Sequence, residues 1–205
     1  MKIKNLGIAL VAAVMMMIPS TQAATLDIGL FSTGNFTVDA GSTYQPTQSA
    51  FGLTTNTTVI AGDNFYGEFS SAKDLTNYGF VRDSNNMYTN NQLGLEISVT
   101  SQAAPFFFTV TLFDSAFTQI QAYTGNTAGL TATPTFVALT PQVGSNDVGG
   151  LITQAQYLQF GWDGAGAVNA TVSKLQANVI PEPSSASLLA LGVAGLVALR
   201  ARRKS

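Results

Sequence analysis

The chain has 205 residues and contains neither cysteine nor histidine, which excludes disulfides, thiolate catalysis, histidine-based triads and the commonest protein ligand of zinc, copper and iron. Its formal net charge is −2, but six of its nine basic residues lie in the two terminal segments, so residues 24–180 carry ten acids and three bases, a net charge of −7. A domain this acidic has no basic surface for nucleic acid, so we expect no nucleic-acid partner.

Residues 1–23 are typical of a secretory signal peptide. Two lysines precede an apolar run from Leu6 to Ile18, and Thr21 and Ala23 place small residues at the two positions that signal peptidase reads. The thirteen residues of the apolar run are too few to span a membrane, which disfavours a permanent anchor. We therefore expect export, with cleavage by signal peptidase after Ala23.

Residues 24–180 have the pattern of an all-β domain, with short runs rich in Thr, Val, Phe and Tyr separated by Gly, Asn, Ser and Asp. Helix is expected only as single turns near 71–76 and 151–156. These 157 residues suffice for one core but not for two ordinary domains. An antiparallel two-sheet sandwich with jelly-roll-like connections would bury the many phenylalanines. The predicted strands are 25–31, 36–38, 57–61, 65–69, 78–81, 93–100, 106–113, 117–123, 135–139, 157–162 and 168–179.

Two consecutive predicted strands, 93–100 and 106–113, show the clearest patterns. The first alternates leucine, isoleucine and valine with glycine and polar residues, so one of its faces is expected to be wet. The second has apolar side chains in both phases, which predicts a central strand covered on both sides. Residues 101–105 have the length of a hairpin loop that would join the pair.

The last predicted strand, 168–179, changes phase along its length. Its apolar residues alternate in one phase before Ser173 and in the other phase after Lys174. Because a slip of one residue exchanges the two faces of a strand, the sequence predicts a bulge near these two residues.

Two stretches of the domain offer candidate binding chemistry. Asp83 and Asn85 lie in a polar loop with three further asparagines, and their side-chain oxygens are the ligands that calcium prefers. The loop lacks the glycine and the terminal acid of a known calcium loop, and its residues are also ordinary turn residues. Trp162, the only tryptophan, and Asp163 stand together at a strand end. They would either contact a sugar ring or serve as a core residue and a turn residue. No other cofactor is expected.

The domain offers no pattern that indicates an enzyme. Glycoside hydrolysis needs two acids across a cleft, and nothing local selects a pair among the ten acids. Glu68 and Glu96, the only glutamates of the domain, fall on predicted strands, where outward-facing solubilising positions explain them. A serine or threonine nucleophile needs a base, and the two lysines of the domain, Lys73 and Lys174, stand in no recognised spacing. We therefore expect a protein without catalytic activity.

The segment 181–205 has the composition of a sorting or anchoring signal. Pro181-Glu182-Pro183 forms a stiff, extended spacer, because each proline removes a backbone donor and disfavours helix at the preceding residue. Residues 184–199 would span roughly 24 Å as an apolar helix, less than the bilayer core of about 30 Å. Four basic residues follow, at the C-terminal end of the expected helix, where the helix dipole favours positive charge. We call them the basic stop: Arg200, Arg202, Arg203 and Lys204.

This tail resembles the PEP-CTERM sorting signal of exported proteins of Gram-negative bacteria, which a membrane cysteine protease called exosortase recognises. The resemblance covers residues 181–204 and rests on the order and spacing of the triplet, the apolar helix and the basic stop. It implies processing near Pro181-Glu182-Pro183 and transient membrane anchoring through the helix. It also implies delivery to the cell surface or an extracellular matrix, often alongside exopolysaccharide.

We expect a non-catalytic surface or matrix protein. The alternative is a secreted carbohydrate-binding module or glycan-active enzyme with the same signal.

The leader makes a direct prediction about the exported protein. Mass spectrometry should find its N-terminus at Ala24, because the small residues Thr21 and Ala23 mark the preceding bond for signal peptidase. Recovery of an exported protein that still begins at Met1 would contradict secretion through a cleaved leader.

Overall fold

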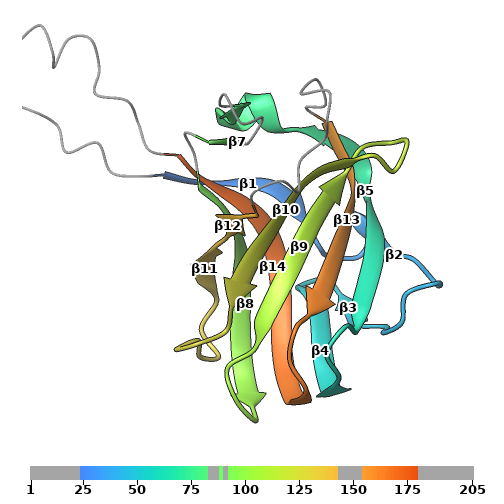
Figure 1. Ribbon diagram of the computed structural model, residues 1–205, viewed down its shortest axis with the longest axis vertical. Helices are drawn as coiled ribbons and strands as arrows, with labels where there is room; N and C mark the ends of the chain where they lie inside the picture. The colour runs from blue at the N-terminus through green and yellow to red at the C-terminus, as the bar shows by residue number, and fades with distance from the viewer. Residues whose placement is uncertain (1–23, 83–87, 90–91, 143–153, 180–205) are drawn as a thin grey trace, which may run out of the picture. The chain divides into compact units, whose positions relative to one another are not determined.

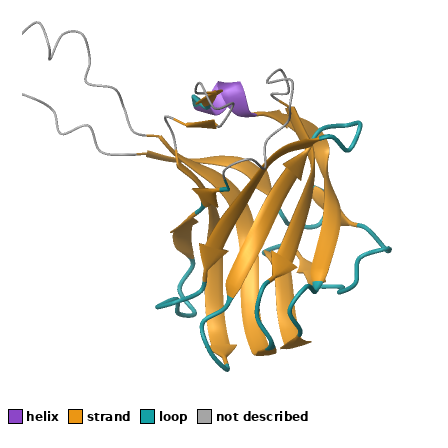
Figure 2. Cartoon of the chain, viewed as in Figure 1, coloured by secondary structure: helices purple, strands orange, loops and turns teal. Residues whose placement is uncertain are grey.

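The computed structural model describes residues 24–82, 88–89, 92–142 and 154–179. Thr25–Val179 form one compact unit. It consists of two antiparallel sheets of six strands each, a separate two-stranded ribbon and a short 3-10 helix. Figure 2 shows how completely strand dominates the domain. The predicted all-β, two-sheet sandwich is confirmed. The 3-10 helix is the only helix within the described ranges, and it is too short to cross a membrane.

The strands and the helix, labelled in chain order, are β1 (Ala24–Leu30), β2 (Phe36–Val38), β3 (Thr47–Ser49), β4 (Gly52–Val59), β5 (Asn64–Asp74), η1 (Leu75–Tyr78), β6 (Val81–Arg82), β7 (Tyr88–Thr89), β8 (Gln92–Gln102), β9 (Phe107–Phe113), β10 (Gln119–Asn126), β11 (Thr135–Ala138), β12 (Thr140–Pro141), β13 (Gln154–Trp162) and β14 (Gly166–Val179).

The chain passes repeatedly from one sheet to the other. Sheet A has the strand order β11-β8-β14-β4-β3, with β1 paired to β14, and sheet B has the order β12-β10-β9-β13-β5-β2 (Figure 1). Strand β4 is followed by β5, β8 by β9 and β13 by β14, each time in the opposite sheet. These crossings are the jelly-roll-like connections that the sequence predicts.

Aromatic rings of sheet B dominate the core between the sheets. Phe160 of β13 stacks between Phe65 of β5 and Phe108 of β9, with ring centroids 5.4 and 5.0 Å away. The Trp162 ring meets Phe160 edge-on at 4.9 Å. All four side chains are at most 2% exposed, and Leu95 of sheet A belongs to the same buried cluster. Such packing is a dense aromatic core of the kind that stabilises a sandwich of this size.

Two details of the strand patterns are confirmed. In β8 the residues that alternate toward the core are all buried, whereas Glu96 and Ser98 between them are partly exposed. In β14 the pairing with β8 shifts register between Val172 and Lys174, which is the predicted bulge. The phase change in the apolar pattern therefore located an irregularity of the backbone correctly.

Several expectations are wrong. Residues 101–105 do not close a hairpin, because β8 lies in sheet A and β9 in sheet B, and the four-residue connection 103–106 crosses between the sheets. Strand β9 is central, between β10 and β13, but its outer face is not fully covered, since the Phe107 ring is 63% exposed. The helical turn expected at 151–156 is also wrong, because β13 begins at Gln154.

The first and last strands of the domain pair with each other in sheet A. Strand β1 begins and β14 ends at the same end of the sandwich (Figure 1). Because β14 also pairs with β8, the last strand is held on both sides up to the end of the domain. Both terminal segments are thus joined covalently to neighbouring strands of one sheet.

The aromatic stack predicts a large effect of one core substitution. Phe160→Ala should lower the free energy of unfolding by about 3–5 kcal/mol, because it removes a buried ring and leaves a cavity. Phe51→Ala, which removes an 83% exposed phenylalanine, should change it by less than about 0.5 kcal/mol. Urea unfolding of both variants measures the difference, and equal effects would contradict the described core.

Candidate functional site

Most residues that the sequence singles out lie outside the described ranges. These are the cleavage residue Ala23, the candidate calcium ligands Asp83 and Asn85, the triplet Pro181-Glu182-Pro183, the helix at 184–199, and the basic stop Arg200, Arg202, Arg203 and Lys204. Trp162 and Asp163 are described. Across the described residues there is no group of three or more acidic side chains that would hold a metal ion.

Of the two interpretations of Trp162, the contact with a sugar ring is wrong. Its side chain is 1% exposed and packs edge-on against Phe106, Phe108 and Phe160. The indole Nε1 is buried and has no hydrogen-bond partner among the described residues. A ring enclosed in this way cannot stack on a sugar, so the other interpretation of Trp162, as a core residue, is correct.

Asp163 is exposed, and its contacts are those of a turn residue. Its backbone N–H donates to the Phe107 carbonyl at 2.9 Å, and its carboxylate accepts a hydrogen bond from the Thr109 hydroxyl at 2.9 Å. These bonds link the end of β13 to β9. Asp163 thus lies on the surface of sheet B without the aromatic partner that the sequence suggested.

The outer face of sheet A carries a shallow polar depression of about 340 Å³. Its lining consists of hydroxyl, amide and small apolar side chains: Asn56, Thr57, Thr58, Ser101, Ala167, Val168 and Asn169. Asn169 of β14 lies directly between Asn56 of β4 and Ser101 of β8 in the strand register. The depression contains hydrogen-bonding groups but no aromatic ring and no charge.

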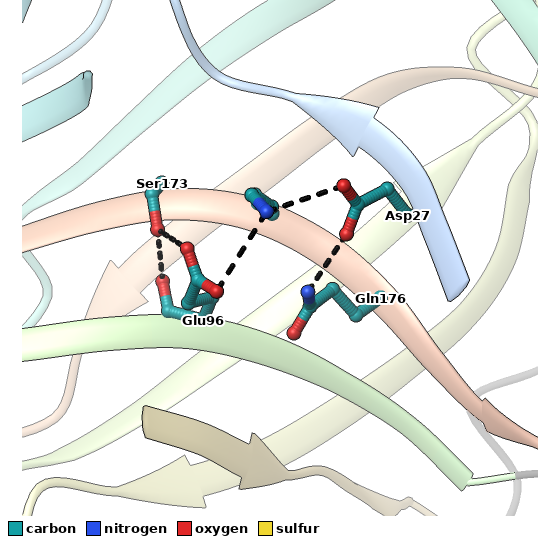
Figure 3. Close-up of polar contacts among 5 residues, drawn as sticks. Asp27, Glu96, Ser173 and Gln176 are labelled. Carbon is teal, nitrogen blue, oxygen red and sulfur yellow. Dashed lines mark hydrogen bonds and ion pairs between the residues drawn. The ribbon is translucent and has the colours of Figure 1, made fainter. Parts of the chain in front are cut away.

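The bulge in β14 creates a cluster of charged and polar side chains on sheet A (Figure 3). The Lys174 ammonium lies 3.2 Å from the Asp27 carboxylate of β1 and 3.8 Å from the Glu96 carboxylate of β8. The Ser173 hydroxyl donates to Glu96 at 2.6 Å, and the Gln176 amide donates to Asp27 at 2.8 Å. Three strands are therefore tied together by one cation and its two acids.

The contacts of this cluster link strands β1, β8 and β14. Each carboxylate accepts a hydrogen bond and faces the same ammonium, so contacts within the cluster hold both acids in place. The other glutamate, Glu68, is exposed on β5 and accepts a hydrogen bond from Gln156 at 3.0 Å.

The pKa of Tyr44 is clearly displaced from its ordinary value. Burial raises the pKa of Tyr44 to about 12, the nearby Thr55 hydroxyl opposes this shift, and the Asp63 charge adds to it. The phenol therefore stays protonated at neutral pH. Its ring lies 6.4 Å from that of Phe65, so Tyr44 packs beside the core instead of presenting a base to solvent.

The outer face of sheet B is different, because it exposes aromatic rings. Phe117, in the turn between β9 and β10, stacks on Tyr157 of β13 with ring centroids 4.0 Å apart and planes inclined by 16°. The Phe117 side chain is 57% exposed. Phe113 of β9 is the strand-register partner of Tyr157, and Tyr66 of β5 is the partner of Gln159. We call the surface formed by Phe117, Tyr157, Phe113, Tyr66 and Gln159 the aromatic face.

A family comparison identifies the C-terminal segment. Residues 179–204 match the PEP-CTERM protein-sorting motif. The chain carries a PEP-CTERM sorting signal. The match includes Pro181-Glu182-Pro183 and all of the basic stop, so the resemblance seen in the sequence is confirmed. The PEP-CTERM signal marks the chain as an exported protein that is sorted at the membrane.

No curated protein sequence matches the chain significantly. Among solved structures, a xylan-binding module, CBM15, aligns with a TM-score of 0.45 and 11% identity, over 78% of this chain and 99% of that one. The family 11 carbohydrate-binding module of the cellulosomal cellulase Lic26A-Cel5E of Clostridium thermocellum aligns with a TM-score of 0.42 and 7% identity, over 78% and 96%. The family 30 module of the cellulosomal cellulase Cel9D-Cel44B of Clostridium thermocellum gives 0.37 and 15%, over 78% and 96%. These distant similarities assign no ligand to the PEP-CTERM chain.

The aromatic face was not predicted from the sequence, although the pattern of β13 indicates part of it. In β13 Leu158, Phe160 and Trp162 share one phase, and Tyr157 and Gln159 share the other. Since the first set is apolar throughout, it belongs in the core, and the second set must face outward. The stacking of Phe117 had no comparable signal, because it depends on a turn conformation.

The charged cluster makes a prediction about salt. Lys174→Met should lower the free energy of unfolding by up to about 1 kcal/mol at low salt, because Asp27 and Glu96 then repel each other without a cation between them. The loss should shrink in about 1 M salt, where the Debye length is only about 3 Å. Lys73→Met is the control, since its ammonium contacts Ser71 instead of a carboxylate. Denaturant unfolding at two salt concentrations checks this, and a loss independent of salt would argue against the ion pairs.

Proposed function

We propose that this chain is a non-catalytic surface or matrix protein that exosortase processes near Pro181-Glu182-Pro183 after export. The observation that carries the proposal is the PEP-CTERM match at residues 179–204. That match begins at the residue where β14 ends, and β1 begins at the residue after the predicted signal-peptidase site. The β-sandwich therefore occupies the chain between the two signals, as expected of the cargo of such a pathway.

The position of the triplet supports processing without damage to the domain. Ala177 of β14 is fully buried, and β14 ends at Val179, two residues before Pro181. Cleavage near the triplet would remove no residue of the described core. The two prolines also disfavour a helix and a central strand at this point in the sequence.

Side-chain chemistry supports a non-catalytic role. The chain has no histidine or cysteine to act as a base or nucleophile at neutral pH. Asp27 and Glu96 are both engaged with Lys174. Surface or matrix delivery would place the acidic domain beside exported polysaccharide, outside the inner membrane.

The alternative is a secreted carbohydrate-binding module or a glycan-active enzyme that carries the same signal. One observation favours the binding module within this alternative: Phe117 and Tyr157 form an exposed, stacked pair of rings on sheet B. Both functions use the same route, and they differ only in what the domain contacts after export.

Variants of the tail test the route. Glu182→Ala, or neutral replacement of Arg200, Arg202 and Arg203 together, should leave export through the inner membrane intact while unprocessed precursor accumulates there. Glu68→Ala makes the same chemical change as Glu182→Ala on the exposed surface of β5 and should be processed normally. Immunoblots of fractionated cells measure precursor and product. Normal processing of both tail variants would overturn the proposal.

A further inference from the structure

We infer that the aromatic face of sheet B binds a neutral polysaccharide chain. This inference rests on the proposed function, because only an exported domain meets extracellular polysaccharide. It adds a binding site and a ligand class that the sorting signal does not provide. The carrying observation is the pair of Phe117 and Tyr157, whose rings stack at 4.0 Å while Phe117 stays 57% exposed.

The backbone at Phe117 shows that the position of this ring is not incidental. Phe117 has φ +59° and is the only non-glycine residue with positive φ in the described part of the chain. Bulky side chains are rare in this left-handed conformation, and glycine or asparagine normally occupies such a turn position. The Asp114 carboxylate holds the turn by accepting hydrogen bonds from the backbone N–H groups of Ala116 and Thr118, at 2.8 and 2.7 Å. The sequence thus places an aromatic ring where glycine would be less strained.

The ring does not serve the buried core. Its neighbour Tyr157 belongs to the outward-facing phase of β13, opposite Leu158 and Phe160. Stacking on Tyr157 fixes the orientation of Phe117, so little side-chain freedom remains to be lost when a ligand binds. Exposed rings of this kind offer a flat apolar surface that water leaves readily.

Hydrogen-bonding groups surround the rings. Across the strands, Tyr157 pairs with Phe113 on one side and with Glu68 on the other. Tyr66 pairs with Gln159, two residues further along β13, so both lie within about 8 Å of Tyr157 on the same face. Among the described residues, the Tyr66 hydroxyl and the Gln159 amide have no hydrogen-bond partner, so both are available to a ligand.

This combination matches the chemistry of a sugar. A pyranose ring has apolar C–H faces, which pack on aromatic rings, and hydroxyl groups at its edges, which pair with amide, phenol and carboxylate groups. The net charge of −7 on residues 24–180 and the Glu68 carboxylate beside Tyr157 would repel a uronate-containing chain. The ligand is therefore a neutral polysaccharide.

Native affinity gels test binding with the exported protein purified from the cells that make it. The gels contain hydroxyethylcellulose, mixed-linkage β-glucan or galactomannan, all neutral, or polygalacturonate, which is acidic. We expect at least one neutral polysaccharide to retard the protein and polygalacturonate not to retard it. No retardation in any neutral gel, or a preference for polygalacturonate, would overturn the inference.

Phe117→Gly is the decisive variant, because glycine suits the turn and only the ring is lost. We expect at least a tenfold loss of affinity with a melting temperature close to that of the unchanged protein. Phe51→Ala is the matched control, since it removes a phenylalanine that is 83% exposed on the turn between β3 and β4. Equal losses in both variants, or no loss in Phe117→Gly, would exclude the aromatic face as the site.

Two measurements separate polysaccharide binding from self-association and from a failure of sorting. Light scattering should show a monomer whose mass does not change in Phe117→Gly, whereas a dimer that depends on Phe117 would assign the face to a second copy of the chain. Phe117→Gly should also be exported and processed normally. A protein that is processed but binds no polysaccharide would refute only the binding site. A protein that is never processed would refute the sorting function, whatever the gels show.

Discussion

The packing of Phe160 between Phe65 and Phe108 fixes the geometry on which the rest of sheet B depends. Side chains alternate along a strand, so burial of Phe160 together with Leu158 and Trp162 forces Tyr157 and Gln159 to the outside. A slip of one residue would place the tryptophan in water and bury a glutamine, which the burial free energy of several aromatic rings prevents. The same contacts that form the core therefore determine which side chains the domain displays.

Sheet A contains both the first and the last strand of the domain, and these two strands must be held side by side. Strand β14 pairs first with β4 and then with β1, and the bulge between Val172 and Lys174 changes its phase between the two. The phase change brings Lys174 outward, where it joins Asp27 and Glu96. The bulge that interrupts the pairing of β14 with β8 thus places Lys174 where it forms an ion pair with Asp27 of β1. The last strand of the fold ends at Val179, the residue at which the sorting-motif match begins.

Regular features of this structure were predictable from sequence, and features that depend on one backbone angle or one crossing were not. The alternation in β8 and the phase change in β14 are properties of consecutive residues, so pattern alone located both. The connection at 101–105 has a length that suits a hairpin or a crossing between sheets, and only the packing of the sheets decides between them. The tail was recognisable because its triplet, apolar run and basic residues form a linear motif. The two interpretations of Trp162 stayed open because a strand end by itself does not show which way a side chain faces, whereas the phase of the whole strand places Trp162 in the core.

The left-handed conformation of Phe117 is not required by the fold, and it places an exposed aromatic ring on the surface. A turn that needs only to connect β9 and β10 is better satisfied by glycine, which adopts this conformation without steric conflict. Stacking on Tyr157 offsets part of the strain, but it leaves more than half of the Phe117 side chain in water, so burial gains little. A core this extensive tolerates one unfavourable backbone angle, because strain of this size is small beside the burial of rings such as Phe108 and Phe160. The stability of the core therefore permits a surface feature that stability alone does not favour, which is the relation expected between a scaffold and a binding site.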